Sequence, residues 1–479
     1  MKRYVNKITV SGLTGLVMLT AAGAYAGRTV LGRSDNSFTP AAPLSRNALA
    51  TQSRGVVPTQ IENGVFLTTE HFRVFWGNDF DRNDKEWGQN GEKGTPLWVV
   101  TLANSMEYAL GEYNRMGFAP PYGVENYYID IYVGNTGLRV YSDKTGKFEE
   151  IALFSDYYAF ANINRDYGVA YFIFNDDFSA YSEDELPVLK TVAAHELFHA
   201  VQRAEGYPWD AENIEDGPEY IDAERWTDEG WWVEASATWM EEEIFPDVND
   251  YTKYVSVFLA APYQPLFTLN GLHEYGASIF AGYVRFMSEG LEALVGVMSD
   301  AYPLGVEEAL RKNIGIYSGD SLEDAVTKFW SMAANPSGYW PDGGLYETDY
   351  APKVADSVVR LPYSTSAPGG RAPGRFGANL FTLDTSVLPA PVTLNPKSAE
   401  GDMRFALVAG DSANARVANQ DEILLAPPGG GGETAYGAVV NVSANGGPLD
   451  YKLTIGEKPG SAGGSGGGGG GCFLEALRR

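Results

Sequence analysis

The sequence is poor in several residue types, and each shortage excludes a class of structure or partner. Among 479 residues there is one cysteine, Cys472, which excludes any disulfide within the chain. Histidine is nearly as scarce, with four residues in all. Lysine and arginine number 35 against 62 aspartates and glutamates, a net charge of −27. So acidic a chain is a poor partner for nucleic acid or anionic lipid.

Long apolar runs are also rare, and the only candidate lies at the N-terminus. It has a basic start, an apolar centre from Ile8 to Ala22, and small residues at Ala24 and Ala26. This pattern predicts a signal peptide over residues 1–26 that is cleaved before Gly27, an uncleaved membrane anchor being the alternative. The sequence therefore predicts an exported protein without an integral membrane span in its mature part.

What the chain does contain is ample material for a core. Apolar residues make up 44% and aromatic residues 13%, as in globular proteins, and the length suggests two to three domains. The predicted organisation after the signal peptide is a linker or short pro-segment (27–65), an α+β domain (66–350), a small β-sandwich (360–457) and a Gly-rich tail that carries Cys472 (458–479).

The α+β assignment comes from the order of patterns along the chain. Strand patterns come first and helical patterns follow, rather than alternating. Strands are predicted at 72–76, 127–133 and 169–174, and helices at 95–113, 184–204, 231–241, 250–260, 276–300, 306–313 and 320–333. Beyond residue 355, short β-prone runs alternate with Gly, Pro and Ser turns at a spacing typical of a sandwich.

The most informative stretch is an H-E-x-x-H run formed by His195, Glu196 and His199. In a helix, residues four apart lie on one face, so both imidazoles can bind one tetrahedral cation such as Zn²⁺. Glu196 lies about 100° round the helix from His195, where it can take a proton from a water molecule on the metal. Because histidine is so scarce, two unrelated histidines are a weaker interpretation of this run.

A catalytic zinc site needs a third protein ligand. The sequence after His199 does not supply a third histidine at the spacing of H-E-x-x-H-x-x-G-x-x-H. A glutamate on the next predicted helix is the other solution. Glu234 lies among small and apolar neighbours, and its competitors on the same helix are Glu241, Glu242 and Glu243.

Together the two motifs resemble those of a known enzyme family. His195-Glu196-x-x-His199, followed by Trp231-x-x-Glu234-Ala235-x-Ala237-x-Trp239-x-Glu241, is similar to the gluzincin zinc metallopeptidases and to exported bacterial metalloproteases. The resemblance spans about residues 186–290. It implies a thermolysin-like arrangement of a sheet followed by active-site helices, with His195, His199 and Glu234 as zinc ligands and Glu196 as general base. The 34 residues between His199 and Glu234 exceed the spacing of the aminopeptidases of this family.

The resemblance also proposes an oxyanion-stabilising residue. The segment from His273 to Ser278 is similar to the family's Y-E-K-G-A segment, whose tyrosine has this role. Aligning the Gly-Ala pairs places His273 at the tyrosine's position, and Tyr275 falls two residues later. Both residues remain candidates, beside the structural alternative of a core tyrosine and a surface histidine.

These features predict an exported zinc metallopeptidase that acts on protein or peptide substrates. The exopeptidase signature G-x-M-E-N is missing, which favours an endopeptidase. The strand at 169–174 is a hypothetical edge for an extended substrate. The alternatives are a non-catalytic surface protein whose sandwich binds protein or polysaccharide, and a zinc hydrolase of non-peptide amides or esters. The oligomeric state is not determined by these patterns.

Two further segments carry open hypotheses. The acidic stretch from 206 to 229 is predicted to be a solvated loop, and a Ca²⁺ site is the alternative, because hard oxygen ligands are plentiful there but follow no ordered ligand spacing. The Gly-rich tail is similar to C-terminal sorting tails, so the protein is expected to be secreted or held at the cell surface through Cys472.

Overall fold

The computed structural model describes the chain in segments, which are residues 54–80, 95–142, 145–153, 158–164, 166–179, 184–205, 223–288, 290–346, 354–360, 363–384, 392–397, 402–410, 415–418, 423–425, 434–444 and 447–457. The predicted signal peptide, the tail with Cys472 and the part of the acidic stretch from 206 to 222 lie outside them. Residues 223–229, expected in a loop, begin a helix.

A five-stranded sheet forms one end of the molecule. Its strands are β2 (Gly64–Thr68), β3 (Phe72–Gly77), β4 (Ile129–Val133), β8 (Val169–Phe174) and β7 (Ala159–Asn164), in that spatial order. The inner strands β3, β4 and β8 are parallel, and β2 and β7 run antiparallel at the two edges. These inner strands are mostly apolar, as buried parallel strands are, and the two charged residues in them, Arg73 and Asp130, form a buried ion pair of 2.7 Å.

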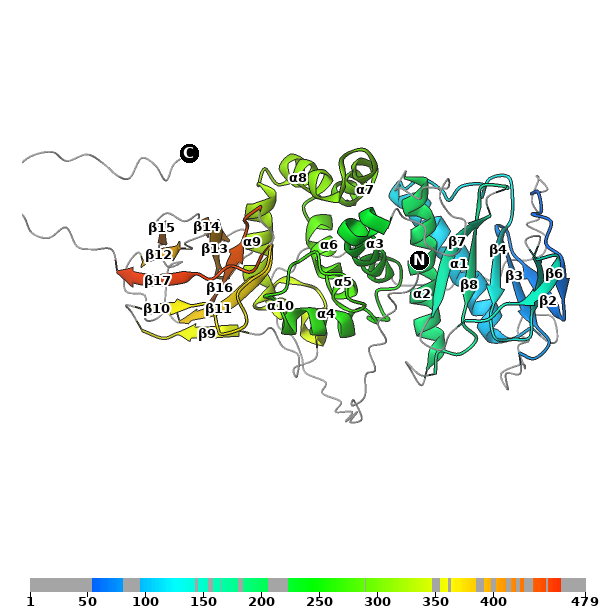
Figure 1. Ribbon diagram of the computed structural model, residues 1–479, viewed down its shortest axis with the longest axis horizontal. Coiled ribbons are helices and arrows are strands. Elements are labelled where there is room, and N and C mark those ends of the chain that lie inside the picture. The colour runs from blue at the N-terminus through cyan, green and yellow to red at the C-terminus, as the bar shows by residue number, and fades with distance from the viewer. Residues whose placement is uncertain are drawn as a thin grey trace, which may run out of the picture.

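Two helices of 20 residues, α1 (Leu97–Met116) and α2 (Glu185–Ala204), pack against one face of this sheet (Figure 1). Their apolar faces and the inward residues of β3, β4 and β8 belong to one hydrophobic core. Tyr113 of α1 is fully buried, and its hydroxyl donates a hydrogen bond of 2.8 Å to the carbonyl oxygen of Ala194 in α2. The turn of α2 that precedes the H-E-x-x-H run is thereby held against α1.

The opposite face of the sheet carries a smaller layer. It is a three-stranded sheet of β1 (Ile61–Glu62), β5 (Arg139–Ser142) and β6 (Lys147–Glu150). Phe75, Tyr132 and Leu138 form a small core between the layers. Residues 54–65, expected in the linker, therefore contribute β1 and the start of β2 to the folded body.

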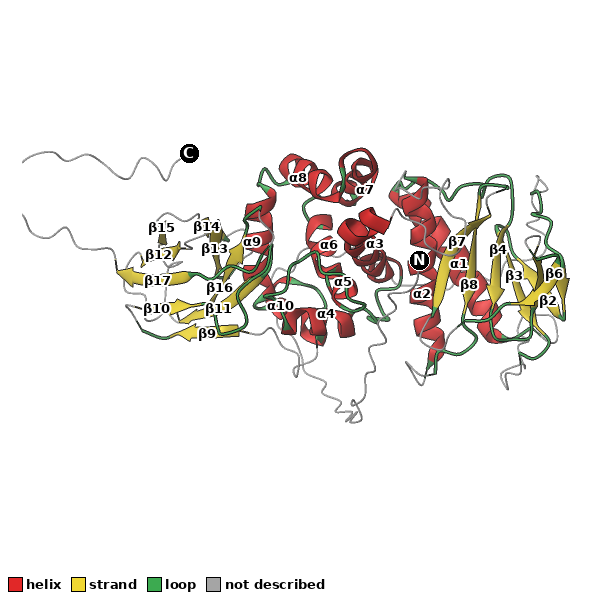
Figure 2. Cartoon of the chain, viewed as in Figure 1, coloured by secondary structure: helices red, strands yellow, loops and turns green. Residues whose placement is uncertain are grey.

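Helices fill the middle of the molecule (Figure 2). They are α3 (Ala223–Ile244), α4 (Thr252–Ala260), α5 (His273–Gly276), α6 (Ser278–Arg285), α7 (Glu292–Leu304), α8 (Val306–Tyr317), α9 (Leu322–Ala333) and α10 (Pro336–Tyr339), followed by the 3₁₀ turn η1 (Gly343–Leu345). Trp231, Trp232 and Trp239 of α3 are buried in the hydrophobic core. The single helix predicted over 276–300 is broken between α6 and α7.

Two sheets form the C-terminal part. The first contains β14 (Arg416–Ala418), β13 (Met403–Val408), β16 (Thr434–Asn441), β11 (Ala378–Asp384) and β9 (Val354–Val358), and the second β10 (Tyr363–Ser366), β17 (Lys452–Glu457), β12 (Val392–Lys397) and β15 (Ile423–Leu425). Residues of both sheets share a second hydrophobic core. Because β9 belongs to the first sheet, this part begins before the expected residue 360.

The C-terminal part is joined to the helices by a continuous core rather than by a linker. Helix α9 packs on β13 and β16, and Phe376, Leu380 and Val440 belong to the same core as the helices. The indole nitrogen of Trp330 donates a 2.7 Å hydrogen bond to the carbonyl oxygen of Phe376. The contact between α9 and the first of these sheets is therefore part of the main hydrophobic core.

Among the described helices, none combines the length and apolarity needed to cross a bilayer.

Candidate metal centre

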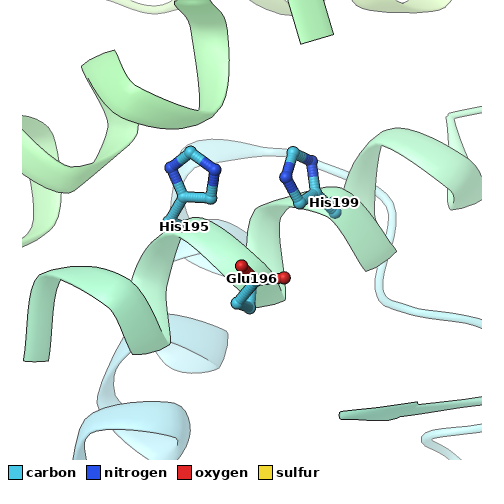
Figure 3. Close-up of side chains that lie close together, drawn as sticks. All are labelled: His195, Glu196 and His199. Atoms are coloured by element: carbon cyan, nitrogen blue, oxygen red, sulfur yellow. The ribbon is translucent and has the colours of Figure 1, made fainter. Parts of the chain in front are cut away.

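Helix α2 presents the H-E-x-x-H run at the boundary between the sheet and the helical part. The apolar residues of α2 fix its orientation, and His195 and His199 then project from the face that looks towards α3. Their ring centroids are 4.7 Å apart (Figure 3). Donor atoms of His195, Glu196 and His199 all lie within 4.8 Å of one another, a spacing suited to a single metal ion.

Helix α3 brings Glu234 to the same point. Its Oε2 lies 3.1 Å from Nε2 of His195 and 3.7 Å from Nε2 of His199. Two ligands of a tetrahedral zinc ion at ordinary bond lengths are about 3.3 Å apart. Both distances lie within a few tenths of an ångström of that spacing, so Glu234 is placed where it could share a zinc ion with the two histidines.

The second nitrogen of His195 is held by a carboxylate. Nδ1 of His195 donates to Oε1 of Glu241 at 2.8 Å, and both side chains are buried. A histidine held in this way turns its Nε2 towards the metal, because its Nδ1 keeps the proton. Burial lowers the pKa of His195, but Glu234 and Glu241 outweigh it and raise that pKa well above the usual value. A cation that binds takes the place of the Nε2 proton.

Gln202 holds Nδ1 of His199, as Glu241 holds Nδ1 of His195. Nε2 of Gln202 donates to the carbonyl oxygen of Val233 at 2.9 Å and to Oγ of Ser236 at 3.0 Å. These two bonds turn its Oε1 towards Nδ1 of His199, at 2.8 Å. Nδ1 of His199 must then carry the proton, so its Nε2 has a lone pair for the metal. The same amide also holds the turn of α3 beside Glu234.

Replacing Gln202 by Leu is therefore expected to weaken zinc binding by about 10–100-fold, the usual effect of losing an outer partner of a metal ligand. The measurement is a zinc titration against a competing chromophoric chelator. The variant Glu205→Gln is the matched control, because the Glu205 side chain accepts from Ala119 and Ser299 and not from a residue of the metal centre. Zinc affinity unchanged in Gln202→Leu would show that His199 needs no such partner.

Glu196 lies beside the three donors with one unused oxygen. Its Oε2 is buried and has no hydrogen-bond partner among the described residues, and the backbone N–H of Ala161 hydrogen-bonds to its carboxylate. Burial is the largest cause that raises the pKa of Glu196 to about 7, with Glu234 and Glu241 adding to it and His195 opposing it. A divalent cation bound nearby would lower this pKa.

The pKa of Glu234 is shifted in the opposite direction. Burial would raise it, but His199 and His195 outweigh burial and hold the pKa below its usual value. A carboxylate that stays ionised is the form that binds a metal. The environment therefore separates the two glutamates into an ionised one among the metal donors and a more basic one beside them.

The competing glutamates of α3 have other partners. Glu241 binds His195 as described, and Glu243 pairs with Arg285 at 2.7 Å and accepts from the indole of Trp239 at 3.1 Å. Glu242 is buried on the same helix, and no contact between it and a histidine of the site is present among the described pairs. Glu234 is the glutamate of α3 that approaches Nε2 of both histidines.

Tyr275 and His273, the two oxyanion candidates, point to different places. The Tyr275 ring lies 6.1 Å from the His195 ring, and its hydroxyl hydrogen-bonds to Glu234. The charge of Glu234, followed by burial, raises the pKa of Tyr275 well above its usual value, so the hydroxyl stays protonated. Gly276 lets α5 approach α4, since a Cβ there would lie 2.4 Å from the Tyr254 carbonyl oxygen.

His273 instead lies in the aromatic core. Its ring is 4.7 Å from that of Phe258, and it hydrogen-bonds to the Pro265 backbone. Burial lowers its pKa to about 4, so it is neutral at physiological pH. Among the described contacts of His273, none involves a residue of the metal centre. The surface position considered for it is wrong, because only 3% of its surface is exposed.

The strand at 169–174, which was expected to pair with substrate along its edge, is not an edge strand. β8 lies between β4 and β7, so neither of its edges is open. β7 is the edge strand next to α2. Period-two patterns predict that a segment is a strand but not where it lies in the sheet, so the sequence could not separate the two.

Sequence reasoning missed Gln202 as a partner of His199 and named Glu241 only as a rival ligand. A signal existed for both. Gln202 follows His199 by three residues, and Glu241 follows Glu234 by seven, so each shares a helix face with a predicted ligand. The spacing along each helix does not give the angle between α2 and α3, so it could not show which residues of the two helices meet.

Comparison with known proteins adds little to this geometry. No protein-family model matches the chain, and no curated protein matches it in sequence. Among solved structures, a family GH115 4-O-methyl-α-glucuronidase with specificity for decorated arabinogalactans aligns with 59% of the chain at 9% identity and a TM-score of 0.15. The aligned region covers 43% of that enzyme. So low a score carries no argument about fold or activity.

Proposed function

We propose that this chain is a zinc-dependent peptidase, and an endopeptidase by the absence of an exopeptidase signature. The observation that carries the proposal is the approach of Glu234 Oε2 to Nε2 of both His195 and His199, with the unused oxygen of Glu196 beside them. Each imidazole is also fixed from behind, by Glu241 or Gln202. A chance cluster of two histidines and a glutamate would not need these outer partners.

Zinc supplies Lewis-acid chemistry at such a site, because it acidifies a water molecule and polarises a carbonyl group. The remaining work falls to the side chains. Glu196 accepts the proton of the attacking water and transfers it to the leaving amine nitrogen. The Tyr275 hydroxyl, held protonated by its neighbours, donates to the oxygen of the scissile carbonyl as that oxygen gains charge.

The outer edge of β7 has no strand partner among the described residues and is suited to hold the peptide. The carbonyl oxygens of Tyr158 and Asn164 accept hydrogen bonds from Asn175 and Gly168 on the β8 side. Backbone groups alternate along a strand, so those of Ala159, Ala161 and Ile163 face away from β8. An extended peptide added at this edge would pass Ala161, whose N–H reaches Glu196.

Metal removal tests the proposal directly. Purified mature protein is expected to hold about one zinc per chain and to cleave casein, and a chelator is expected to abolish cleavage until zinc is restored. Metal content by mass spectrometry and fluorescent casein release are the measurements. A protein that binds no zinc when supplied with it would refute the catalytic proposal and favour a surface-binding role. Zinc without any casein or peptide cleavage would favour a hydrolase of non-peptide amides or esters.

The two oxyanion candidates can be separated by substitution. Tyr275→Phe is expected to lower kcat by about 10²-fold with little change in KM, the usual effect of losing one oxyanion donor. His273→Asn is expected to change kcat far less and to lower the melting temperature, because His273 fills an aromatic core. The reverse order of the two kcat effects would assign the role to His273.

A further inference from the structure

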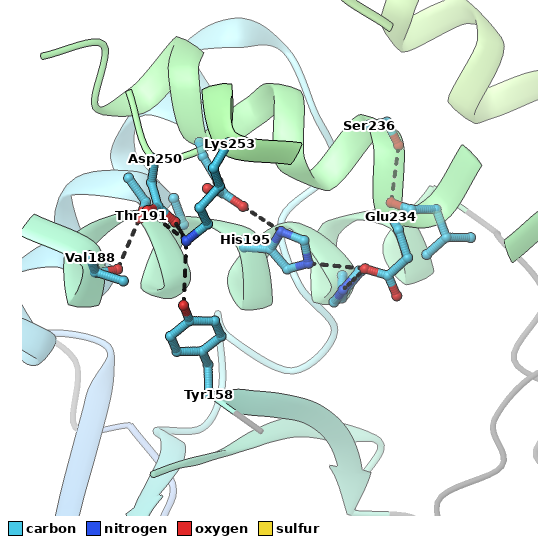
Figure 4. Close-up of polar contacts among 12 residues, drawn as sticks. Tyr158, Val188, Thr191, His195, Glu234, Ser236, Asp250 and Lys253 are labelled. Carbon is cyan, nitrogen blue, oxygen red and sulfur yellow. Dashed lines mark hydrogen bonds and ion pairs between the residues drawn. The ribbon is translucent and has the colours of Figure 1, made fainter. Parts of the chain in front are cut away.

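Lys253 bridges the helical part and the sheet beside the metal centre. Its Nζ lies 2.8 and 3.0 Å from the two carboxylate oxygens of Asp250. It also donates to the Tyr158 hydroxyl at 3.4 Å, which is longer than an ordinary hydrogen bond. Tyr158 directly precedes β7, so the ammonium group of this α4 residue reaches the start of the edge strand (Figure 4).

Lys253 lies close to the catalytic residues. Glu241, which holds His195, has a pKa raised mainly by burial, and the charges of Asp250 and Lys253 also act on it, in opposite directions. Nζ of Lys253 lies 4.9 Å from the centroid of the Tyr254 ring. The Tyr254 and Tyr275 rings are 5.2 Å apart. Lys253, Tyr254 and Tyr275 therefore form a continuous row that ends at the metal centre.

The direction of β7 shows which part of a bound peptide would meet Lys253. A peptide added antiparallel to β7 places its C-terminal residues at the Tyr158 end of the strand. Because Glu196 is the proposed general base, its contact with Ala161 would place the scissile bond near that residue. Three residues of strand span about 10 Å, so Tyr158 and Lys253 lie opposite the first three residues that follow that bond.

We propose that Lys253 determines specificity by binding a carboxylate of the substrate one to three residues C-terminal to the scissile bond. The carboxylate belongs to an acidic side chain or to the C-terminus of a peptide. The inference rests on the proposed peptidase function. A carboxylate would replace the long contact with Tyr158 by a charge-assisted hydrogen bond. An ammonium group has three donors, so the one that now reaches Tyr158 can serve the substrate while Asp250 keeps its two contacts.

A purely structural role for Lys253 makes a different prediction. If the lysine only offsets the charges of Asp250 and Glu241, its loss would lower kcat/KM by the same factor for all substrates. If it binds substrate, its loss would affect acidic substrates selectively. The ratio of kcat/KM between matched glutamate and glutamine peptides separates the two roles.

The experiment uses zinc-loaded full-length protein and fluorogenic peptides in which one Glu or Gln is moved along the sequence, with the cleaved bond located by mass spectrometry. All of these peptides are C-terminally amidated. A second set compares a free C-terminal carboxylate with an amide, which separates the two sources of the carboxylate. Wild-type protein is expected to prefer Glu to Gln by about tenfold or more after the scissile bond, mainly through KM.

Variants then test the assignment. Lys253→Met is expected to reduce the preference to about one, since a charged hydrogen bond is lost. Asp250→Asn is expected to increase the preference, because it leaves Lys253 without its carboxylate partner. Lys312→Met is the matched control, since Lys312 forms the same kind of pair with Asp300, at 2.7 Å, between α8 and α7. It is expected to leave the ratio unchanged.

Several outcomes would overturn the inference. They are equal cleavage of the Glu and Gln peptides by wild-type protein, a preference confined to positions before the scissile bond, or a preference that survives Lys253→Met. If no peptide is cleaved, binding of the same peptides to zinc-loaded Glu196→Gln protein decides the matter by fluorescence anisotropy. Tighter binding of the Glu peptides than of the Gln peptides, with this preference lost when Lys253→Met is added, would support the Lys253 subsite even if the protein cleaves no peptide. If no peptide binds, the subsite is refuted. Zinc content and casein cleavage test the peptidase proposal separately, so a failure of that proposal can be distinguished from a failure of the Lys253 subsite.

Discussion

Replacing Glu196 by Gln is expected to reduce peptide cleavage by about 10²–10⁴-fold while the protein keeps its zinc. The amide has the shape of the carboxylate but cannot accept the proton of the attacking water. Zinc should remain, because the three proposed ligands, His195, His199 and Glu234, are unchanged in this variant. The measurements are kcat/KM on a fluorogenic peptide, zinc content per chain and the melting temperature.

A matched control is available on the same helix. Glu205, at the C-terminal end of α2, accepts hydrogen bonds from the Ala119 backbone and the Ser299 hydroxyl. Glu205→Gln removes a carboxylate from α2 without touching the metal centre, so kcat/KM should remain within a few fold of wild type. Activity that survives in Glu196→Gln, or zinc that is lost with it, would show that Glu196 is not the general base.

The second large effect is expected at Glu234. Glu234→Ala removes a proposed ligand, so zinc affinity should fall by more than about 100-fold, beyond the range seen for outer partners, and cleavage should be lost at ordinary zinc concentrations. Glu241→Gln should weaken zinc by about 10–100-fold, because it disturbs only the orientation of His195. Glu243→Gln should leave zinc affinity unchanged, since Glu243 pairs with Arg285 and Trp239.

The ranking of these three variants by zinc affinity tests the ligand assignment more sharply than any one of the affinities alone. Competition with a chromophoric chelator gives the three affinities under one set of conditions. A larger loss in Glu241→Gln than in Glu234→Ala would exchange the roles of the two glutamates. Equal losses in all three would point to a general effect of negative charge on α3 rather than to coordination.

Much of the fold was predictable because it depends on local patterns. The helix around His195 and the strands at 72–76 and 169–174 lie where hydrophobic periodicity places them. The domain boundaries were predicted less accurately than these elements. Residues 61–62 and 64–65 pair with strands of the sheets, and β9 begins at Val354, because short strands without strong periodicity form only when a neighbouring strand is present.

The sequence by itself determined the pairing of His195 with His199 and the place of Glu196 beside them, since spacing along one helix fixes which residues share a face. Tertiary structure decided everything that joins separate elements. It selected Glu234 on α3, assigned Glu241 and Gln202 to hold the histidines, brought Tyr275 rather than His273 to the site, and set Lys253 opposite β7. The physical reason is range: helix geometry acts over a few residues, whereas the angle between two helices depends on core packing contributed by the whole chain.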